Sequence, residues 1–233
     1  MANDSIEIPK HLPVMTLRGV VLFPKAMMPL RIFEERYREM LDEVLNSTRV
    51  FGIVCERENV AEDEVHLEHP FGVATAGLIR VSKKHEDGTS FVLLQGIKRV
   101  KVRGISQEMP YRIIETEEME SISDESSHHI RKEIEQALEQ NKLLGGEVTD
   151  EMLEFLTPLD DDDAFVDLAA FTLCKHTLRK QAMLEVQHLS KRASMLLTDL
   201  HRENDRLATI KQLMQQSEED GALAVVALDA RGA

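Results

Sequence analysis

The sequence changes character near residue 120, and this change limits the fold more than any other feature. Before it, short apolar runs rich in β-branched residues alternate with glycine, proline and charged residues, which is typical of β-strands. After it, apolar residues recur every three or four positions, which is typical of helices. We therefore expect an α+β protein with a sheet-forming part (1–120), a helical part (121–216) and a mobile tail (217–233).

The apolar runs of the first part predict about six strands. The seven runs cover residues 12–17, 28–33, 50–55, 72–81, 90–95, 99–105 and 111–117. Prolines in the first two runs place them near sheet edges or strand starts, because proline cannot donate to a ladder. The pair Asp87-Gly88 predicts a hairpin turn, since both residues tolerate positive φ. One helix interrupts the strands between Glu34 and Ser47, where five apolar residues share one helical face.

The second part predicts a helical hairpin or a small bundle. A helix from about Ile130 ends at Gly145-Gly146, a short one runs from its N-cap Thr149 to Leu156, and a third covers Ala164 to His176. A long helix follows, with a roughly heptad apolar stripe from Leu189 to Met214. Such a stripe can seal a monomeric bundle or a homodimer, and the sequence does not choose between them.

The charge distribution argues against nucleic acid and membrane surfaces as partners. The net charge is −14; residues 1–120 carry 16 basic and 20 acidic side chains, and residues 121–233 carry 12 and 22. An acidic field repels phosphate groups. The one basic run, Lys98 to Arg103, alternates with apolar residues and is interpreted as a solvated strand face.

The apolar runs, the N-terminal residues and the cysteines predict the compartment in which the protein is found. No apolar run approaches the length of a membrane span, and residues 1–10 lack the layout of a signal peptide. Cys55 and Cys174 lie in segments that we expect to be buried, which suits a reducing compartment. We expect a cytoplasmic protein.

No constellation of catalytic residues is evident, so we expect no enzymatic activity. There is no glycine-rich phosphate loop ending in Gly-Lys-Ser/Thr. The neighbours Ser82-Lys83 and Ser190-Lys191 cannot face each other on a strand or a helix. Both cysteines are interpreted as small buried hydrophobes.

No metal site or cofactor is predicted either. The histidine groups 66–69 and 128–129 lack the cysteines that would complete a zinc set, so we interpret them as exposed loop residues. The run Asp160 to Asp163 lacks the glycine and the closing glutamate of an EF-hand. We interpret it as an N-cap with favourable charge for the next helix, and a low-specificity ion site stays open as an alternative.

One segment, Leu12 to Pro24, closely resembles the opening of the N-terminal substrate-binding domain of Lon proteases. It has the Leu-Pro start, an apolar strand, Leu17-Arg18, a hydrophobic run and Phe23-Pro24. Further similar pieces follow in the family's order, namely Met28-Pro29-Leu30, Gly72-Val73-Ala74, Gly77-Leu78-Ile79, Asp87-Gly88-Thr89 and Gln95 to Val100. Together they cover about residues 11–118, and residues 163–171 resemble the family's helical part more weakly.

The resemblance implies a PUA-like twisted β-barrel or sheet with one inserted helix, followed by an α-helical bundle. It also implies binding of unfolded or exposed polypeptide segments, and a full-length Lon protease is a second candidate partner. The family's phosphate-loop ATPase and Ser-Lys peptidase motifs are absent from this sequence, so we expect a stand-alone, non-catalytic, adaptor-like module. Two rival interpretations are an RNA-binding PUA-like protein, which the net charge and the absence of Trp disfavour, and a protein that self-associates through the 189–214 stripe.

Candidate contact residues follow Phe23-Pro24. Met27, Met28 and Phe33 would form an adaptable apolar surface if exposed. The alternative is that Met28, Leu30 and Phe33 belong to the core. The residues that match the family motif are interpreted as structural rather than as contacts: Leu17, Arg18, Phe23, Pro24, Pro29, Gly72, Gly77 and Gly96.

Overall fold

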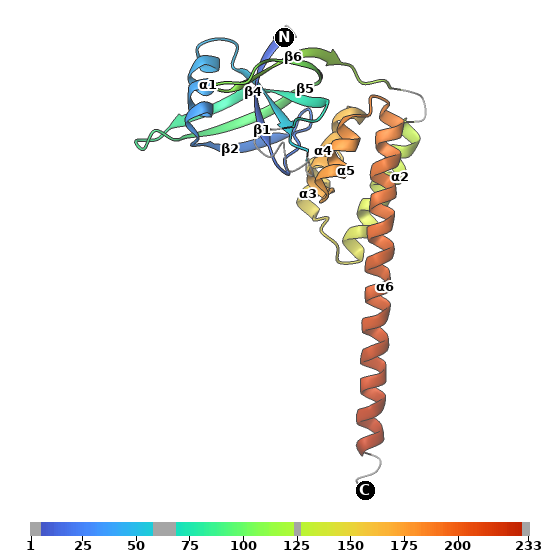
Figure 1. Cartoon of the computed structure of the whole chain (residues 1–233). Coiled ribbons are helices and arrows are strands. Elements are labelled where there is room, and N and C mark those ends of the chain that lie inside the picture. Colours follow the sequence, from blue (N-terminus) through green and yellow to red (C-terminus); the bar gives the residue numbers. More distant parts are fainter. Residues whose placement is uncertain (1–5, 58–68, 124–126, 230–233) are drawn as a thin grey trace.

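The computed structural model describes residues 6–57, 69–123 and 127–229 (Figure 1). A sheet with one helix occupies one end of the molecule, and five helices follow it. Among the described residues, none of the helices combines the length and the apolar composition that a membrane crossing requires.

Six strands form one sheet in the described part of the chain: β1 (His11–Leu17), β2 (Met27–Ile32), β3 (Val50–Cys55), β4 (Val73–Lys84), β5 (Ser90–Gln107) and β6 (Arg112–Met119). Their order is β2-β5-β4-β3-β1-β6, and a further pairing of β5 with β6 closes the sheet into a ring. Among these six strands, only the β1–β3 pair is parallel. Strand β2 lies outside the ring at the end of the order, so the edge position that its proline predicted is confirmed.

The two apolar runs 90–95 and 99–105 belong to a single long strand, β5. Its first half pairs with β2 and its second half with β6, while β4 runs along both. Strands β4 and β5 form the hairpin that Asp87-Gly88 predicted, and Gly88 has φ +80°. The hairpin tip projects away from the helices that follow the sheet in the chain (Figure 1).

Gly96 lies where the loop between β1 and β2 crosses β5. The amide N of Gly96 donates to the Ala26 carbonyl at 2.9 Å, and the amide N of Lys25 donates to the Gly96 carbonyl at 2.8 Å. A Cβ atom on Gly96 would lie 2.1 Å from the carbonyl oxygen of Phe23. Only glycine allows the two backbones to approach this closely.

Helix α1 (Glu35–Leu45) confirms the predicted inserted helix. It buries Tyr37, Met40, Leu41 and Val44 in the same hydrophobic cluster as Ile32, Ile79, Val92 and Leu94 of the sheet. One side of the β2–β5–β4 region therefore belongs to the hydrophobic core. Each large apolar side chain that is fully buried there stabilises the fold by about 1.5–3 kcal/mol.

The helical part contains α2 (Ser127–Leu143), α3 (Asp150–Leu156), α4 (Asp162–Leu173), α5 (Thr177–Leu184) and α6 (Leu189–Asp229). The predicted stop after α2 is confirmed, because Gly145 has φ +77°. The predicted cap of α3 is confirmed too, since the Thr149 hydroxyl accepts from the Met152 amide at 3.3 Å. Helix α5 is a separate element that the sequence did not predict.

Helices α2 and α6 lie side by side, and α6 extends well beyond the rest of the molecule (Figure 1). Two buried amides join them: Asn141 Nδ2 donates to Asn204 Oδ1 at 2.9 Å, and Asn204 Nδ2 donates to the Ala137 carbonyl at 2.9 Å. Helix α6 continues beyond residue 216 as far as Asp229. The mobility predicted for residues 217–233 stays a prediction.

A buried ion cluster joins the sheet to the helices. Arg99 of β5 donates to Asp167 Oδ1 of α4 at 2.6 Å and to the Leu184 carbonyl at 3.1 Å. Arg192 of α6 lies with its Nε 3.4 Å from Asp167 Oδ1, and it also pairs with Asp163. Burial raises the pKa of the Asp167 carboxyl, against the lowering effect of the two arginines, and burial lowers the pKa of Arg192.

This cluster corrects the interpretation of the basic run as a solvated strand face. Arg99 is only 4% exposed. The other cations of the run lie nearer the surface. Lys101 and Arg103 pair with Glu117 of β6, and Lys98 pairs with Glu118 of β6 and with Glu120 just beyond it. The prediction failed at Arg99 because the alternation shows which residues share a strand face, whereas the helices that cover this face lie more than 60 residues further along the chain.

The predicted division at residue 120 stays a prediction. One continuous hydrophobic cluster contains residues of β1 to β6 and of α1 to α6. A second, smaller cluster fills the inside of the ring with residues such as Leu12, Val50, Ala76, Val100 and Ile114.

Candidate functional site

An apolar surface lies on the side of β2, β5 and β4 that faces away from α1. Residues paired across a ladder point to the same side of a sheet. In one row, Phe91 of β5 pairs with Arg31 and with Lys83; in the next, Leu93 pairs with Pro29 and with Val81. In a third row, Met27 pairs with Gln95. These eight residues are here called the β2–β5–β4 face.

Exposed apolar side chains gather on this face. Met27 is 40% exposed, Phe91 41% and Val81 47%. Phe33, one residue beyond β2, continues the alternation of that strand toward the same side and is 63% exposed. Large apolar side chains at this exposure in one place are typical of a surface that binds another molecule.

The structure separates the three predicted contact residues. Met27 and Phe33 lie on the surface, whereas Met28 is 9% exposed and belongs to the core beside α1. The alternative that these residues belong to the core therefore holds for Met28 but not for Phe33. Met27 and Phe33 remain candidate contacts. The predicted group did not contain Phe91, Val81 or Leu93, although the alternation within Ser90 to Gln95 was a signal for Phe91.

The face also carries positive charge. Arg31 and Lys83 lie on either side of Phe91. Arg31 lies 3.6 Å from Asp87 in an exposed ion pair, and Lys83 has no ion-pair partner in the described part of the chain. Both cations line an open hollow of about 800 Å³ at the hairpin tip, which continues to Lys84, His85, Glu86, Asp87 and Thr89.

The nearest carboxylate is engaged in the turn. Asp87 Oδ1 accepts from the Thr89 hydroxyl at 2.7 Å and from the Thr89 amide at 2.9 Å. These two hydrogen bonds lower the pKa of Asp87, with a smaller contribution from Arg31. The Asp87 carboxylate is therefore charged at neutral pH, and it stabilises the turn mainly through its hydrogen bonds to Thr89.

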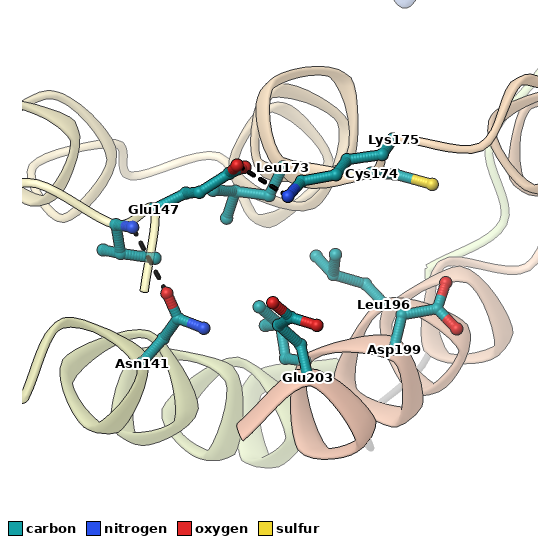
Figure 2. A pocket seen from close by; sticks show the side chains of 10 residues that line it. Asn141, Glu147, Leu173, Cys174, Lys175, Leu196, Asp199 and Glu203 are labelled. Carbon is teal, nitrogen blue, oxygen red and sulfur yellow. Dashed lines mark hydrogen bonds and ion pairs between the residues drawn. The ribbon is translucent and has the colours of Figure 1, made fainter. Parts of the chain in front are cut away.

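A second hollow lies in the helical part, between α2, α4 and α6 (Figure 2). Its volume is about 60 Å³, which is room for a few water molecules. Lys175 and Glu147 pair across it at 2.6 Å. The sulfur of Cys174 points away from this hollow, and burial raises the pKa of its thiol. A protonated thiol is a poor nucleophile.

The motif residues of the first strand and loop have structural surroundings. Leu17 is half-buried at the end of β1, and the exposed Arg18 donates through Nε to Glu56 Oε2 at 2.7 Å. Phe23 and Pro24 are buried, and the guanidinium of Arg99 lies 5.9 Å from the centre of the Phe23 ring.

The remaining motif residues differ from one another. Pro29 is exposed on the β2–β5–β4 face. A Cβ atom on Gly77 would lie 2.6 Å from Leu94, which explains glycine at that position, whereas one on Gly72 would meet nothing within 4 Å. Pro29 was predicted to be structural rather than a contact residue, although it lies on the exposed face. The structural roles of the glycines stay predictions.

The polar groups considered for chemistry have structural partners or lie apart. Asp161 caps α4 by accepting from the Asp163 amide at 3.0 Å, which confirms the N-cap interpretation. Asp162 pairs with Arg131, and Asp163 with Arg192. Within residues 6–57, 69–123 and 127–229, no three His, Cys, Asp or Glu side chains are grouped to hold a metal ion. His66 and Glu68 lie outside the described residues.

The fold defines the class of protein. The structure is similar to the crystal structure of a Lon N-terminal domain protein from Xanthomonas campestris, with a TM-score of 0.58 at 22% identity over 81% of this chain and 97% of that one. It is also similar to the N-terminal domain of the Mycobacterium avium complex Lon protease, with a TM-score of 0.61 at 14% identity over 82% and 98% of the two chains. The α+β fold with a C-terminal helical part is that of Lon N-terminal domains.

The family follows from the sequence comparison. The family described as "ATP-dependent protease La (LON) substrate-binding domain" matches residues 11–202, and this chain belongs to it. Curated relatives include Lon protease 2 of Thermus thermophilus (28% identical over 222 residues) and the Lon protease of Escherichia coli K12 (27% over 214 residues). Each match covers 91% of this chain and 27% or 26% of the relative, so the chain spans about a quarter of their length.

Proposed function

We propose that this chain is a non-catalytic module that binds exposed polypeptide segments on the β2–β5–β4 face. The observation that carries the proposal is the gathering of Met27, Val81 and Phe91 at 40–47% exposure on one side of three neighbouring strands. The family's description as a substrate-binding domain supports it. The matches are to the N-terminal part of Lon proteases rather than to their ATPase or peptidase parts.

The face suits varied polypeptide partners. A methionine and a phenylalanine can adapt to side chains of different shape, and α1 packs behind the strands in the hydrophobic core. Burying the exposed apolar area would contribute about 25 cal/mol per Å² of area removed from water, reduced by the cost of ordering the bound segment. Binding of this kind needs neither nucleotide nor metal, and we propose that it occurs without either.

We place the module in the cytoplasm, where a full-length Lon protease is a second candidate partner. Both cysteines are free and buried, which supports a reducing compartment. Binding to RNA is not favoured, because the cations of the run from Lys98 to Arg103 are engaged in ion pairs with β6 and α4.

Self-association is a second candidate function. The apolar stripe of α6 continues past its last packed turns to Leu213 and Met214, which are exposed. A second copy would cover them in a helical pair. Light scattering of the full chain tests this: a dimer that becomes monomeric in the variant Leu213→Lys, Met214→Lys supports it, and a monomer at high concentration rejects it.

The test of polypeptide binding is fluorescence anisotropy without nucleotide. A labelled, reduced and carboxymethylated protein that cannot fold is compared with its folded form. We expect selective binding of the unfolded form, weakened about tenfold by Phe91→Ser, as for an apolar residue central to an interface. Phe155→Ser is the control, because Phe155 is also an exposed phenylalanine, at 56% against 41% for Phe91, but lies on α3.

Three outcomes decide the proposal. Selective binding that Phe91→Ser weakens and Phe155→Ser leaves unchanged supports it. Binding that both variants affect equally assigns the contact to another surface. No binding of the unfolded form rejects generic capture of polypeptide.

A further inference from the structure

The aromatic centre of the β2–β5–β4 face lies between two cations. Phe91 pairs with Arg31 of β2 on one side and with Lys83 of β4 on the other. Two interstrand spacings separate these cations, or about 10 Å between their backbones. The face itself contains no acidic residue, since its other members are Met27, Pro29, Val81, Leu93 and Gln95.

The acidic groups near these cations leave them available. Asp87 lies 3.6 Å from Arg31, but both side chains are exposed and Asp87 is held by Thr89. An exposed pair of this kind is weak and can exchange with a carboxylate of a ligand. The next acidic residue of the turn, Glu86, lines the hollow at the hairpin tip but forms no ion pair with Lys83 in the described part of the chain. Lys84, on the other side of the strand, pairs with Asp42 of α1.

The net charge of −14 does not remove this local preference. The acidic excess is concentrated in residues 121–233, and the hairpin tip projects away from the helices that these residues form (Figure 1). At physiological ionic strength, exposed charges are screened over about 8 Å. A bound segment therefore senses Arg31 and Lys83 more strongly than the distant carboxylates.

We propose that the β2–β5–β4 face selects polypeptide segments in which an apolar or aromatic residue is bracketed by carboxylates. The apolar side chain would pack against Phe91 and Leu93, while acidic residues on its two sides would pair with Arg31 and Lys83. An extended chain advances about 3.3 Å per residue, so carboxylates two to four residues apart span the distance between the cations. This inference rests on the proposed function and names its substrate class.

The test compares three labelled peptides that share one Phe-Leu centre and differ only in the bracketing residues, which are Asp, Gln or Lys. At low salt we expect the Asp peptide to bind about fivefold more tightly than the Lys peptide, as two exposed ion pairs allow. The ratio should fall as salt is raised. In the variant Arg31→Gln, Lys83→Gln it should approach one.

The matched control is the variant Arg103→Gln, Lys191→Gln. It also removes two positive charges, but from exposed positions on β5 and α6 that lie away from the face. The ratio should persist in this control if the two face cations set it. A ratio that falls equally in both variants would mean that the overall charge is responsible and would overturn the proposal.

The peptides separate this proposal from the one on which it rests. If the Gln peptide binds and the ratio of Asp to Lys peptide is one, the face binds polypeptide without charge selection, and only the present inference fails. If none of the three peptides binds, the face is not a polypeptide site and both proposals fail. A higher affinity for the Lys peptide would reverse the assigned charge preference and also overturn the inference.

Discussion

Removing the carboxylate of Asp167 should weaken the fold more than removing any surface ion-pair partner. Asp167 is almost fully buried and lies between Arg99 at 2.6 Å and Arg192 at 3.4 Å. In the variant Asp167→Ala the two guanidinium groups stay buried without this counter-charge. Breaking a buried pair from one side typically costs about 3–5 kcal/mol, which is a large part of the roughly 5–15 kcal/mol that stabilises a domain.

The structure offers a matched control on the surface. Arg103 and Glu117 also form an arginine–carboxylate pair at 2.6 Å, but each side chain is about half exposed. The variant Glu117→Ala should therefore cost at most about 1 kcal/mol. The double variant Arg99→Met, Asp167→Leu should be more stable than Asp167→Ala, because it replaces the pair by apolar groups and leaves Arg192 its partner Asp163.

Urea unfolding followed by far-ultraviolet circular dichroism measures these free energies, since the chain has no tryptophan to serve as a fluorescence probe. We also expect one transition for sheet and helices, because a single hydrophobic cluster spans both. Losses of unfolding free energy in Asp167→Ala and Glu117→Ala that agree within about 1 kcal/mol would show that the buried ion cluster is no more important than a surface pair.

Three further outcomes are expected. Gly96→Ala should destabilise the protein by about 1–3 kcal/mol through the clash with the neighbouring backbone, whereas Gly72→Ala, with open space around it, should change the unfolding free energy by less than about 0.5 kcal/mol. Burial, and then the hydrogen bond to a glutamate of α1, raise the pKa of Tyr111 in the folded protein to about 12. Because the unfolded chain loses this proton at lower pH, near the ordinary value of 10.0, the free energy of unfolding should fall as the pH rises from 10.0 to about 12. In the variant Tyr37→Phe, absorbance at 295 nm follows Tyr111 alone, and a midpoint near 10 in the folded protein would contradict this. Both buried cysteines should react with a thiol reagent at neutral pH only after urea is added, and rapid labelling of the native protein would show that they are accessible.

Features that depend on neighbouring residues in the chain were predictable from the sequence. The cap by Thr149, the stop at Gly145, the turn at Gly88 and the apolar face of α1 each follow from a few consecutive residues. Their physical causes are backbone conformation, local hydrogen bonds and helical periodicity, which tertiary packing did not override here.

Features that depend on distant segments were not predictable in the same way. Arg99 carries the same local signal as the exposed Arg103, and its burial depends on the packing of α4 and α6, which lie further along the chain. The candidate site shows the same limit. Alternation along β2 could separate Met27 from Met28, but the neighbourhood of Met27, Phe91 and Val81 depends on the register of three strands, which no single run reveals.

The long helix α6 has a mechanical consequence. Arg192 and the packing against α2 hold it at one end, and Asn204 is its last buried residue among those whose side chains are described. From Asn204 to Asp229 it extends as one uninterrupted helix for about 38 Å at 1.5 Å per residue. It is therefore a lever: a tilt of about 10° at Asn204 displaces its far end by about 7 Å over this length. A small adjustment between the helices and the sheet would thus become a large movement at the end of α6, and a pair of spin labels on β5 and the far turns of α6 would read it as a change in distance.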